Sequence, residues 1–468
     1  MAPVPTLQPF HVLDDARKDD KTLPAFMVST TRGFLPRDEP ITELPAEFAA
    51  LDTLLHRCPI KTATGEPGLL AEGRLGEVVE QEFPNLVEHV GKFANDQAML
   101  TALYRDYSFL ASSYLLEPCH HNMLKSGSYG LGRSVLPENI SMPLAEVARL
   151  TGFQPYMEYA GSYALYNYRL LDPTLGLTYD NIAPIRAFEN GLDRTSSEAG
   201  FVLTHVDMVK ESPELVAGAM NTLKGAEHYL AHGDKQLFKD GLKEVMNSLT
   251  KINSVLERMW SRSKPGEYGN FRTFIFGITG QSMFPNGVIY KGVSDTPLSF
   301  RGESGANDSM VPLSDNLLQI SMPESPLTEI LKDFRKYRPG NHMEFLSWVK
   351  SSAEQVGIKK LALEDAESAT LYLHALDQVR DFRWRHWNFT REYIIKKTAH
   401  PTATGGSPII RWLPNQLNAV INTQMEVFKV LEDLNCVTPK IAEVREKVTK
   451  QKGDLTKEVE KFCAERGA

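Results

Sequence analysis

The sequence has little cysteine and no long apolar run. Of 468 residues only Cys58, Cys119, Cys436 and Cys463 are cysteines, they lie far apart, and none stands in a Cys-x-x-Cys spacing. We therefore expect reduced thiols rather than a disulfide framework or a zinc site. No stretch approaches the roughly 18 consecutive apolar residues that span a bilayer, and the first residues do not have the pattern of a secretory signal. These absences predict a soluble, cytoplasmic protein with no membrane partner.

Basic residues are not in excess either. Lys and Arg number 51 against 59 Asp and Glu, which gives a net charge of −8, so we expect no nucleic-acid partner. The sequence also lacks GxGxxG after a strand pattern, GxxxxGK[ST], HExxH and a nucleophile elbow. Dinucleotide, P-loop, zinc-protease and serine-hydrolase chemistries are thereby disfavoured.

What the sequence does contain is helical periodicity. Apolar residues recur at spacings of three and four through most of the chain, and strand patterns are few, so the predicted fold class is mainly α. The start is rich in proline, turn residues gather before position 192, and apolar residues recur every seven positions near the end. We predict four parts: an extended arm (1–40), a small helical domain (41–190), a large helical domain (191–435) and an amphipathic C-terminal helix (436–468).

One candidate ligand is a lone histidine on a helix. After a Pro-Gly break, His342, Phe345, Leu346 and Val349 are spaced 0, 3, 4 and 7, so the imidazole lies on the inward face. A buried imidazole needs a partner. A hydrogen-bonded core histidine is the commoner case, and an axial haem ligand, which needs no second protein ligand beside it, is the alternative.

A second histidine has a similar setting. Thr195-Ser196-Ser197-Glu198 fits a capping box with Thr195 as the cap. In the helix that follows, Phe201, His205, Met208 and Val209 share one face. We expect His205 either to be a satisfied core residue or to face a planar cofactor and a bound ligand.

An arginine lies within an aromatic run. Arg272 is part of Asn270–Phe276, and because a guanidinium stays charged, its burial demands an anion. The candidates are the nearby Glu267, a haem propionate or the α-carboxylate of an amino acid.

Two loops of small residues, Phe300–Ser309 and His400–Pro408, could approach a ligand closely or simply connect helices.

The other histidines carry weaker signals. No constellation of ligands or catalytic groups surrounds five of them in the sequence, and we assign them no role. They are His56, His228, His232, His374 and His386.

Several stretches, in this order, resemble indoleamine 2,3-dioxygenases. They are Leu177–Gly191, Ser197–Val209, Phe271–Gly277, Val288–Ile320, Phe334–Leu346 and Ala403–Ser407. The resemblance implies a small and a large helical domain with haem b between them. It also implies that His342 is the proximal ligand of the haem iron, that His205 lies on the distal side and that Arg272 receives the substrate carboxylate.

The resemblance extends to other positions. Phe201 would pack against the indole ring, and Tyr163 would line the pocket above the haem. The remaining implied positions are Gly302 and Ser304 in the loop near the haem edge and the substrate ammonium, Thr404 and Gly405 in a mobile loop that closes over substrate, and Asp315 as an acidic residue behind the haem site.

The implied activity is haem-dependent insertion of O2 across the indole C2=C3 bond. Its substrate would be L-tryptophan or a related indole, and its product N-formylkynurenine, in the first step of the kynurenine pathway. We expect a monomer. Glu267 stands where the family has an aromatic ring over the indole, and it could neutralise Arg272. The alternatives are therefore a relative that binds haem and O2 with weak or no tryptophan turnover or acts on another indole, and a haem-free helical interaction protein.

Overall fold

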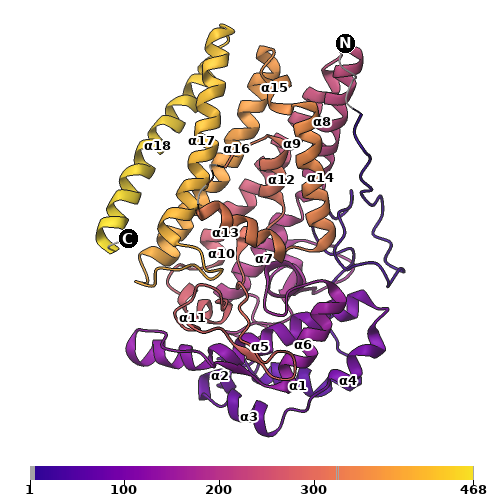
Figure 1. Cartoon of the computed structure of the whole chain (residues 1–468), viewed down its shortest axis with the longest axis vertical. Helices are drawn as coiled ribbons and strands as arrows, with labels where there is room; N and C mark the ends of the chain where they lie inside the picture. The colour runs from indigo at the N-terminus through magenta and orange to yellow at the C-terminus, as the bar shows by residue number, and fades with distance from the viewer. Residues whose placement is uncertain (1–5, 323, 325, 467–468) are drawn as a thin grey trace.

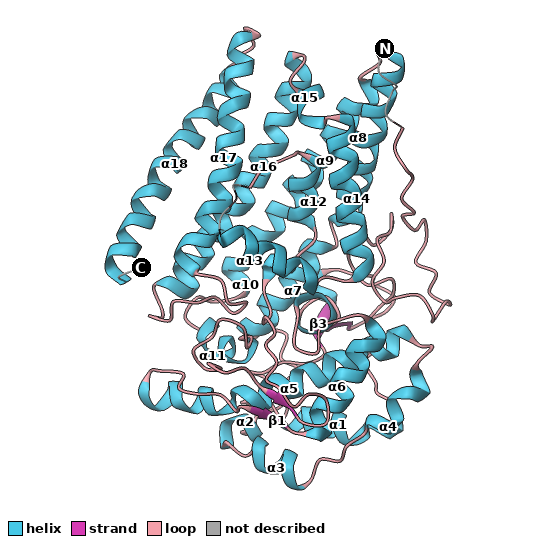
Figure 2. Cartoon of the chain, viewed as in Figure 1, coloured by secondary structure: helices cyan, strands magenta, loops and turns pink. Residues whose placement is uncertain are grey.

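The computed structural model describes residues 6–322, 324 and 326–466, and it confirms the mainly helical prediction (Figure 2). Strands are short in this part of the chain. β1 (Val135–Leu136) pairs in parallel with β4 (Ile289–Tyr290), and β2 (Tyr168–Leu170) pairs antiparallel with β3 (Ile182–Pro184). Among the described helices, none is long and apolar enough to cross a membrane.

The helices form a lower and an upper layer (Figure 1). The lower layer contains α1 (Ala49–Arg57), α2 (Leu69–Glu72), α3 (Leu75–Gln81), α4 (Val87–Val90), α5 (Gln97–Ser126) and α6 (Glu138–Thr151). Most of α5 is buried, because α1, α3 and α6 pack around it. The chain before Ala46 has no helix among its described residues and runs along the upper layer as an extended segment.

The upper layer is made up mostly of long helices. The helices that follow α6 are α7 (Ser197–Val209), α8 (Ser212–His232), α9 (Gln236–Glu257), α10 (Met259–Arg262), α11 (Tyr268–Arg272), α12 (Met310–Leu317), α13 (Pro326–Phe334), α14 (Gly340–Val356), α15 (Ile358–Ala362), α16 (Ala366–Phe389), α17 (Ile409–Asp433) and α18 (Pro439–Arg466). Single turns of other helix types are η1 (Ala46–Phe48), η2 (Gly91–Phe93), η3 (Tyr159–Tyr163), η4 (Tyr179–Asn181), η5 (Thr273–Ile275), η6 (Gly305–Asn307), η7 (Arg335–Tyr337) and η8 (Thr390–Ile395). Of these, η3 and η8 are π-helical.

The C-terminal helix α18 docks on the body of the molecule. Its residues at steps of seven, Ile441, Val448, Leu455 and Phe462, are buried, and the helix packs against α17. Glu458 also accepts a hydrogen bond from Trp387 Nε1 in α16 at 2.6 Å. The last helix therefore supports α16 from outside.

The capping box predicted for α7 is wrong. Ser196 is the cap and accepts from Ala199 N at 3.1 Å, whereas the Thr195 hydroxyl donates to Asp193. Glu198 turns inward instead of reaching back, and its carboxylate accepts from the backbone N–H groups of residues 188 and 189. Burial of Glu198 gives it these tertiary partners, which override the local motif.

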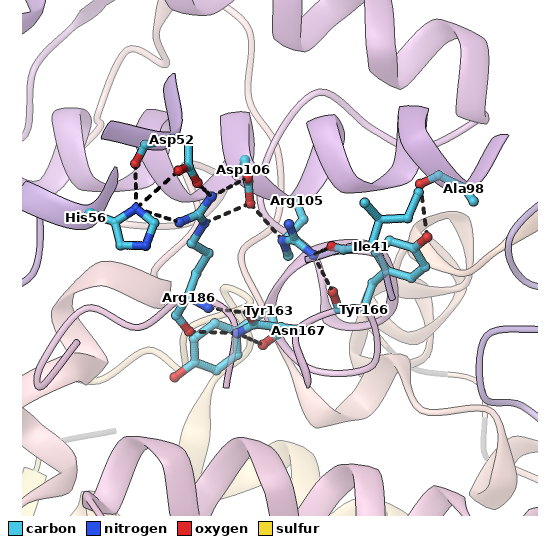
Figure 3. A network of polar contacts seen from close by, with 10 residues as sticks. All are labelled: Ile41, Asp52, His56, Ala98, Arg105, Asp106, Tyr163, Tyr166, Asn167 and Arg186. Atoms are coloured by element: carbon cyan, nitrogen blue, oxygen red, sulfur yellow. Dashed lines mark hydrogen bonds and ion pairs between the residues drawn. The ribbon is translucent and has the colours of Figure 1, made fainter. Parts of the chain in front are cut away.

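A buried ionic network joins the lower layer to the segment that precedes α7 (Figure 3). Asp106 of α5 accepts from Arg105 Nε and from Arg186 Nη2, both at 2.7 Å. Asn167 links the two ends of this segment by donating to the carbonyls of Tyr163 and Arg186. Burial opposes ionisation of Asp106, but the two guanidinium groups outweigh it and lower its pKa to about 2.

We expect Asp106→Asn to lower the free energy of unfolding by about 3–5 kcal/mol, because it leaves two buried guanidinium groups without their shared anion. Since the Asp106 pKa is lower in the folded state, its stabilising contribution is present above the unfolded pKa and is lost as the pH falls toward 2. Urea unfolding at pH 7 and pH 3 measures both effects. Glu146→Gln, which breaks the surface pair with Arg149, should change stability by less than about 1 kcal/mol. An equal effect of the two substitutions would contradict this account.

Candidate functional site

A cavity of about 150 Å³ lies between α7, α11, α16 and the start of α17, and we call it the central cavity. Two loops also contribute to it, at residues 303–308 and 403–409. Its aromatic and aliphatic walls include Phe201, Met208, Leu256, Tyr268, Phe382, Phe389 and Leu413. Its polar side chains are His205, Glu303, Ser304, Asp308, His386, Thr390, Tyr393, Thr404 and Ser407. The cavity is thus apolar with a small number of polar groups, as ligand sites commonly are.

His205 faces the central cavity from α7. Its Nδ1 atom lies 3.2 Å from the Tyr159 hydroxyl of η3, and its ring lies 4.9 Å from that of Phe201, one helical turn earlier. Burial, and secondly the nearby His386, lower the pKa of His205 to about 4. The imidazole is therefore neutral at physiological pH, with its second nitrogen available to a ligand.

His386, to which the sequence analysis assigned no role, faces the same cavity from α16. In the described part of the chain its ring makes no hydrogen bond. Burial and the charge of Arg383 lower the pKa of His386 to about 4, so the imidazole is neutral at physiological pH. The pattern that would have identified it is present, because Phe382, His386, Phe389 and Tyr393 are spaced 0, 4, 7 and 11 and all line the cavity. A neutral imidazole without a partner, aimed into an apolar cavity, is suited to bind a metal.

His342, the predicted proximal ligand, lies outside the lining of the central cavity, although its buried Nε2 also has no hydrogen-bond partner among the described residues. It is 1% exposed, its ring packs 5.0 Å from Phe34 and 5.8 Å from Phe26, and its Nδ1 lies 3.2 Å from Ser309 Oγ. It is not among the residues that line the central cavity. The periodicity placed His342 correctly on a buried face, but the N-terminal arm covers that face.

Asp315, predicted as an acidic residue behind the haem site, pairs with an arginine next to His386. Its Oδ2 accepts from Arg383 Nη2 at 2.6 Å, one helical turn before His386 in α16. Arg383 Nη1 and Asp315 Oδ1 are buried, and no described residue gives either of them a hydrogen bond. The guanidinium can therefore receive a second anion beside His386.

Arg272 is buried next to Thr402, which precedes the cavity-lining residue Ala403, and it is not itself among the residues that line the central cavity. It is 2% exposed and forms no ion pair with any described residue, and none of these residues gives its Nε a hydrogen bond. Its other nitrogens contact the Tyr129 hydroxyl at 3.4 Å and the Thr402 carbonyl at 3.1 Å. Such a guanidinium is suited to a ligand carboxylate.

Glu267 does not neutralise Arg272, so that expectation is wrong. Glu267 Oε1 pairs with Lys264 at 2.9 Å near the surface, and its Oε2 accepts from the Ser197 hydroxyl. The neighbouring residue, Tyr268, lines the cavity instead, and its ring lies 5.6 Å from that of Phe201. An aromatic ring is therefore present one turn before Arg272, at position 268 instead of position 267, where the family resemblance implies it.

Two predicted loop residues line the cavity and two support it. Ser304 and Thr404 line it, and the Thr404 hydroxyl donates to the Glu303 carbonyl at 2.7 Å, which joins the two loops. Gly302 packs against backbone, since a Cβ there would lie 2.1 Å from the nitrogen of residue 277. The Gly405 carbonyl accepts from Arg301 Nη1.

Tyr163 lies behind the cavity wall. It is fully buried, its ring lies 6.4 Å from that of Phe201, and its hydroxyl contacts Glu198 Oε1 at 3.4 Å. It therefore supports the position of Phe201 and does not itself line the cavity.

These features define a mainly helical protein whose central cavity combines aromatic walls with an imidazole that has no hydrogen-bond partner among the described residues. Two buried arginines next to cavity-lining residues, Arg272 and Arg383, each have a nitrogen without a partner in the same part of the chain. A sequence model described as "Indoleamine 2,3-dioxygenase" matches residues 22–408, so the chain belongs to the indoleamine 2,3-dioxygenase family. It is 27% identical to indoleamine 2,3-dioxygenase 1 of Rattus norvegicus over 427 residues, and the matched region is 86% of this chain and 96% of the rat protein.

Two further relatives cover part of the chain. Indoleamine 2,3-dioxygenase of Saccharomyces cerevisiae is 28% identical over 288 residues, which are 57% of this chain and 60% of the yeast protein. A protein named myoglobin from Haliotis diversicolor is 26% identical over 288 residues, which are 59% of this chain and 71% of its own length.

Proposed function

We propose that this chain is a haem-dependent dioxygenase that converts tryptophan, or a closely related indole, to N-formylkynurenine. The observation that carries the proposal is the central cavity, which a neutral His386 without a hydrogen-bond partner in the described chain lines together with the aromatic rings of Phe201 and Tyr268. Membership of the indoleamine 2,3-dioxygenase family supports it.

The residues present fit haem b. His386 would ligate the iron, and the unpaired Nη1 of Arg383, with Asp315 behind it, would receive a propionate. The apolar walls from α7, α16 and α17 suit the faces of a porphyrin. When bound, haem supplies the redox chemistry that activates O2.

The other residues would bind and orient the substrate. Arg272 would hold its carboxylate, and Phe201 and Tyr268 would fix the plane of the indole, which reduces the entropy lost on reaching a reactive geometry. With Nδ1–H donating to Tyr159, the Nε2 of His205 is left as an acceptor for the indole N–H. The apolar walls would exclude water from the reacting atoms.

The relative from Haliotis, whose name is that of an oxygen-binding protein, favours a second candidate function. In that alternative the chain binds haem and O2 without turning over tryptophan. The surface position of Glu267 removes one reason for this alternative, because Arg272 is left free for a substrate.

Turnover by the haem-loaded protein separates the two functions. The dioxygenase proposal predicts a Soret band and steady formation of N-formylkynurenine from L-tryptophan under O2 and a reductant. Glu267→Gln, at the surface, is the control and should behave as the wild type. A protein that binds haem and O2 but forms no product would support the oxygen-binding alternative, and a haem-free protein after haem supplementation would contradict both.

A further inference from the structure

The central cavity contains a carboxyl group that nothing in the described structure pairs with. Glu303 is 2% exposed, it lines the cavity, and its carboxyl group makes no hydrogen bond or ion pair with any described residue. Its backbone is fixed, since the carbonyl accepts from Thr404 at 2.7 Å. Burial raises the pKa of Glu303 to about 8.

The other acidic groups of this region already have partners. Asp308, which also lines the cavity, accepts from the backbone N–H groups of Met310 and Val311. Glu198 accepts from two backbone N–H groups, and Glu158 accepts from Gly161 N at 2.6 Å. A buried carboxyl group without such partners is unfavourable unless a ligand supplies a cation or a donor.

A second buried ionisable group near the cavity, the guanidinium of Arg272, also lacks an ion-pair partner among the described residues. One loop links the two residues, since Arg272 Nη2 donates to the Thr402 carbonyl at 3.1 Å and the Thr404 hydroxyl donates to the Glu303 carbonyl at 2.7 Å. Both residues act on the pKa of Tyr268, which burial raises most, Arg272 lowers and Glu303 raises. An unpaired carboxyl group therefore lines the cavity, and a buried guanidinium without an ion-pair partner among the described residues lies close to the cavity wall.

We propose that Glu303 receives the ammonium group of the substrate and makes the cavity selective for indoles that carry an alkylammonium side chain. With Arg272 holding a carboxylate, the pair matches a zwitterionic indole amino acid, and Glu303 discriminates against indoles that lack the amine. This inference rests on the proposed function, because it assumes that the indole binds in the central cavity.

Three probes separate the two charges of the ligand. L-tryptophan carries both charges, tryptamine carries the ammonium alone, and indole-3-propionate carries the carboxylate alone. Dissociation constants are measured by calorimetry and by haem difference spectra on the haem-loaded wild type and on Glu303→Gln. We expect Glu303→Gln to weaken tryptophan and tryptamine about tenfold or more and to change indole-3-propionate by less than about twofold.

Two further variants keep the test independent of folding. Glu158→Gln alters a carboxyl group that is equally buried but bonded to backbone and outside the cavity lining, and it should leave the order of the three ligands unchanged. If Glu303→Gln does not retain haem, Glu303→Asp keeps the charge and should retain the preference for tryptamine over indole-3-propionate.

The possible failures are distinct. Equal losses for all three ligands in Glu303→Gln, or no loss, would overturn the role of Glu303 while leaving the proposed function intact. If the haem-loaded wild type binds none of the three indoles, the proposed function fails and this inference fails with it.

Discussion

His386→Ala should lower the haem content of the purified protein by about tenfold or more and remove or strongly shift the Soret band, because it deletes the imidazole that we propose as the iron ligand. The side chain faces an apolar cavity and makes no hydrogen bond within the described chain, so its removal should cost the fold little. Haem titration followed by absorbance, with circular dichroism as a check on folding, measures the effect.

His342→Ala is the matched control, since both histidines are neutral and lie on helices of the upper layer. His342 lies between Phe26 and Phe34 outside the cavity, so its loss should reduce stability and leave the Soret position unchanged. Rescue of haem binding in His386→Gly by added imidazole would support direct ligation. Haem loss in the His342 variant alone would show that His342, the residue predicted from the sequence, is the iron ligand.

Arg272→Gln should raise the KM for L-tryptophan by about a hundredfold, or about 3 kcal/mol, because a buried charge-assisted contact with the carboxylate is lost. Binding of tryptamine, which has no carboxylate, should change by much less than binding of tryptophan. Steady-state kinetics and calorimetry provide the two readouts.

Arg262→Gln provides the comparison for Arg272. Arg262 already pairs with Asp207 at 2.9 Å and does not line the central cavity, so its substitution should leave the KM unchanged. A wild-type KM in Arg272→Gln, or an equal loss for tryptophan and tryptamine, would show that the buried guanidinium does not bind the substrate carboxylate.

The helical class of the fold was predictable from periodicity, because apolar spacing reports directly which face of a helix is buried. The tail illustrates this point, since Ile441, Val448, Leu455 and Phe462 all lie against the body. Periodicity does not report what covers the buried face. His342 and His386 have similar patterns, but one contacts the N-terminal arm, more than 300 residues away in the sequence, and the other faces a cavity.

Local motifs failed where tertiary partners compete with them. The carboxylate of Glu198 has a buried backbone site available, so the helix is capped by Ser196 instead of Thr195. Glu267 and Tyr268 are adjacent, and the start of α11 decides which of them points inward. The burial of Arg272 followed from its aromatic neighbours, whereas the isolation of Glu303 could be recognised only once every nearby donor had been located.

The most direct test of the account is a turnover of L-tryptophan by the haem-loaded protein under ¹⁸O2, with the mass of the product measured. The account predicts N-formylkynurenine that contains two labelled oxygen atoms, formed by the wild type and not by His386→Ala. A haem-loaded wild type that yields no such product, or a product with oxygen drawn from water in its place, would contradict it.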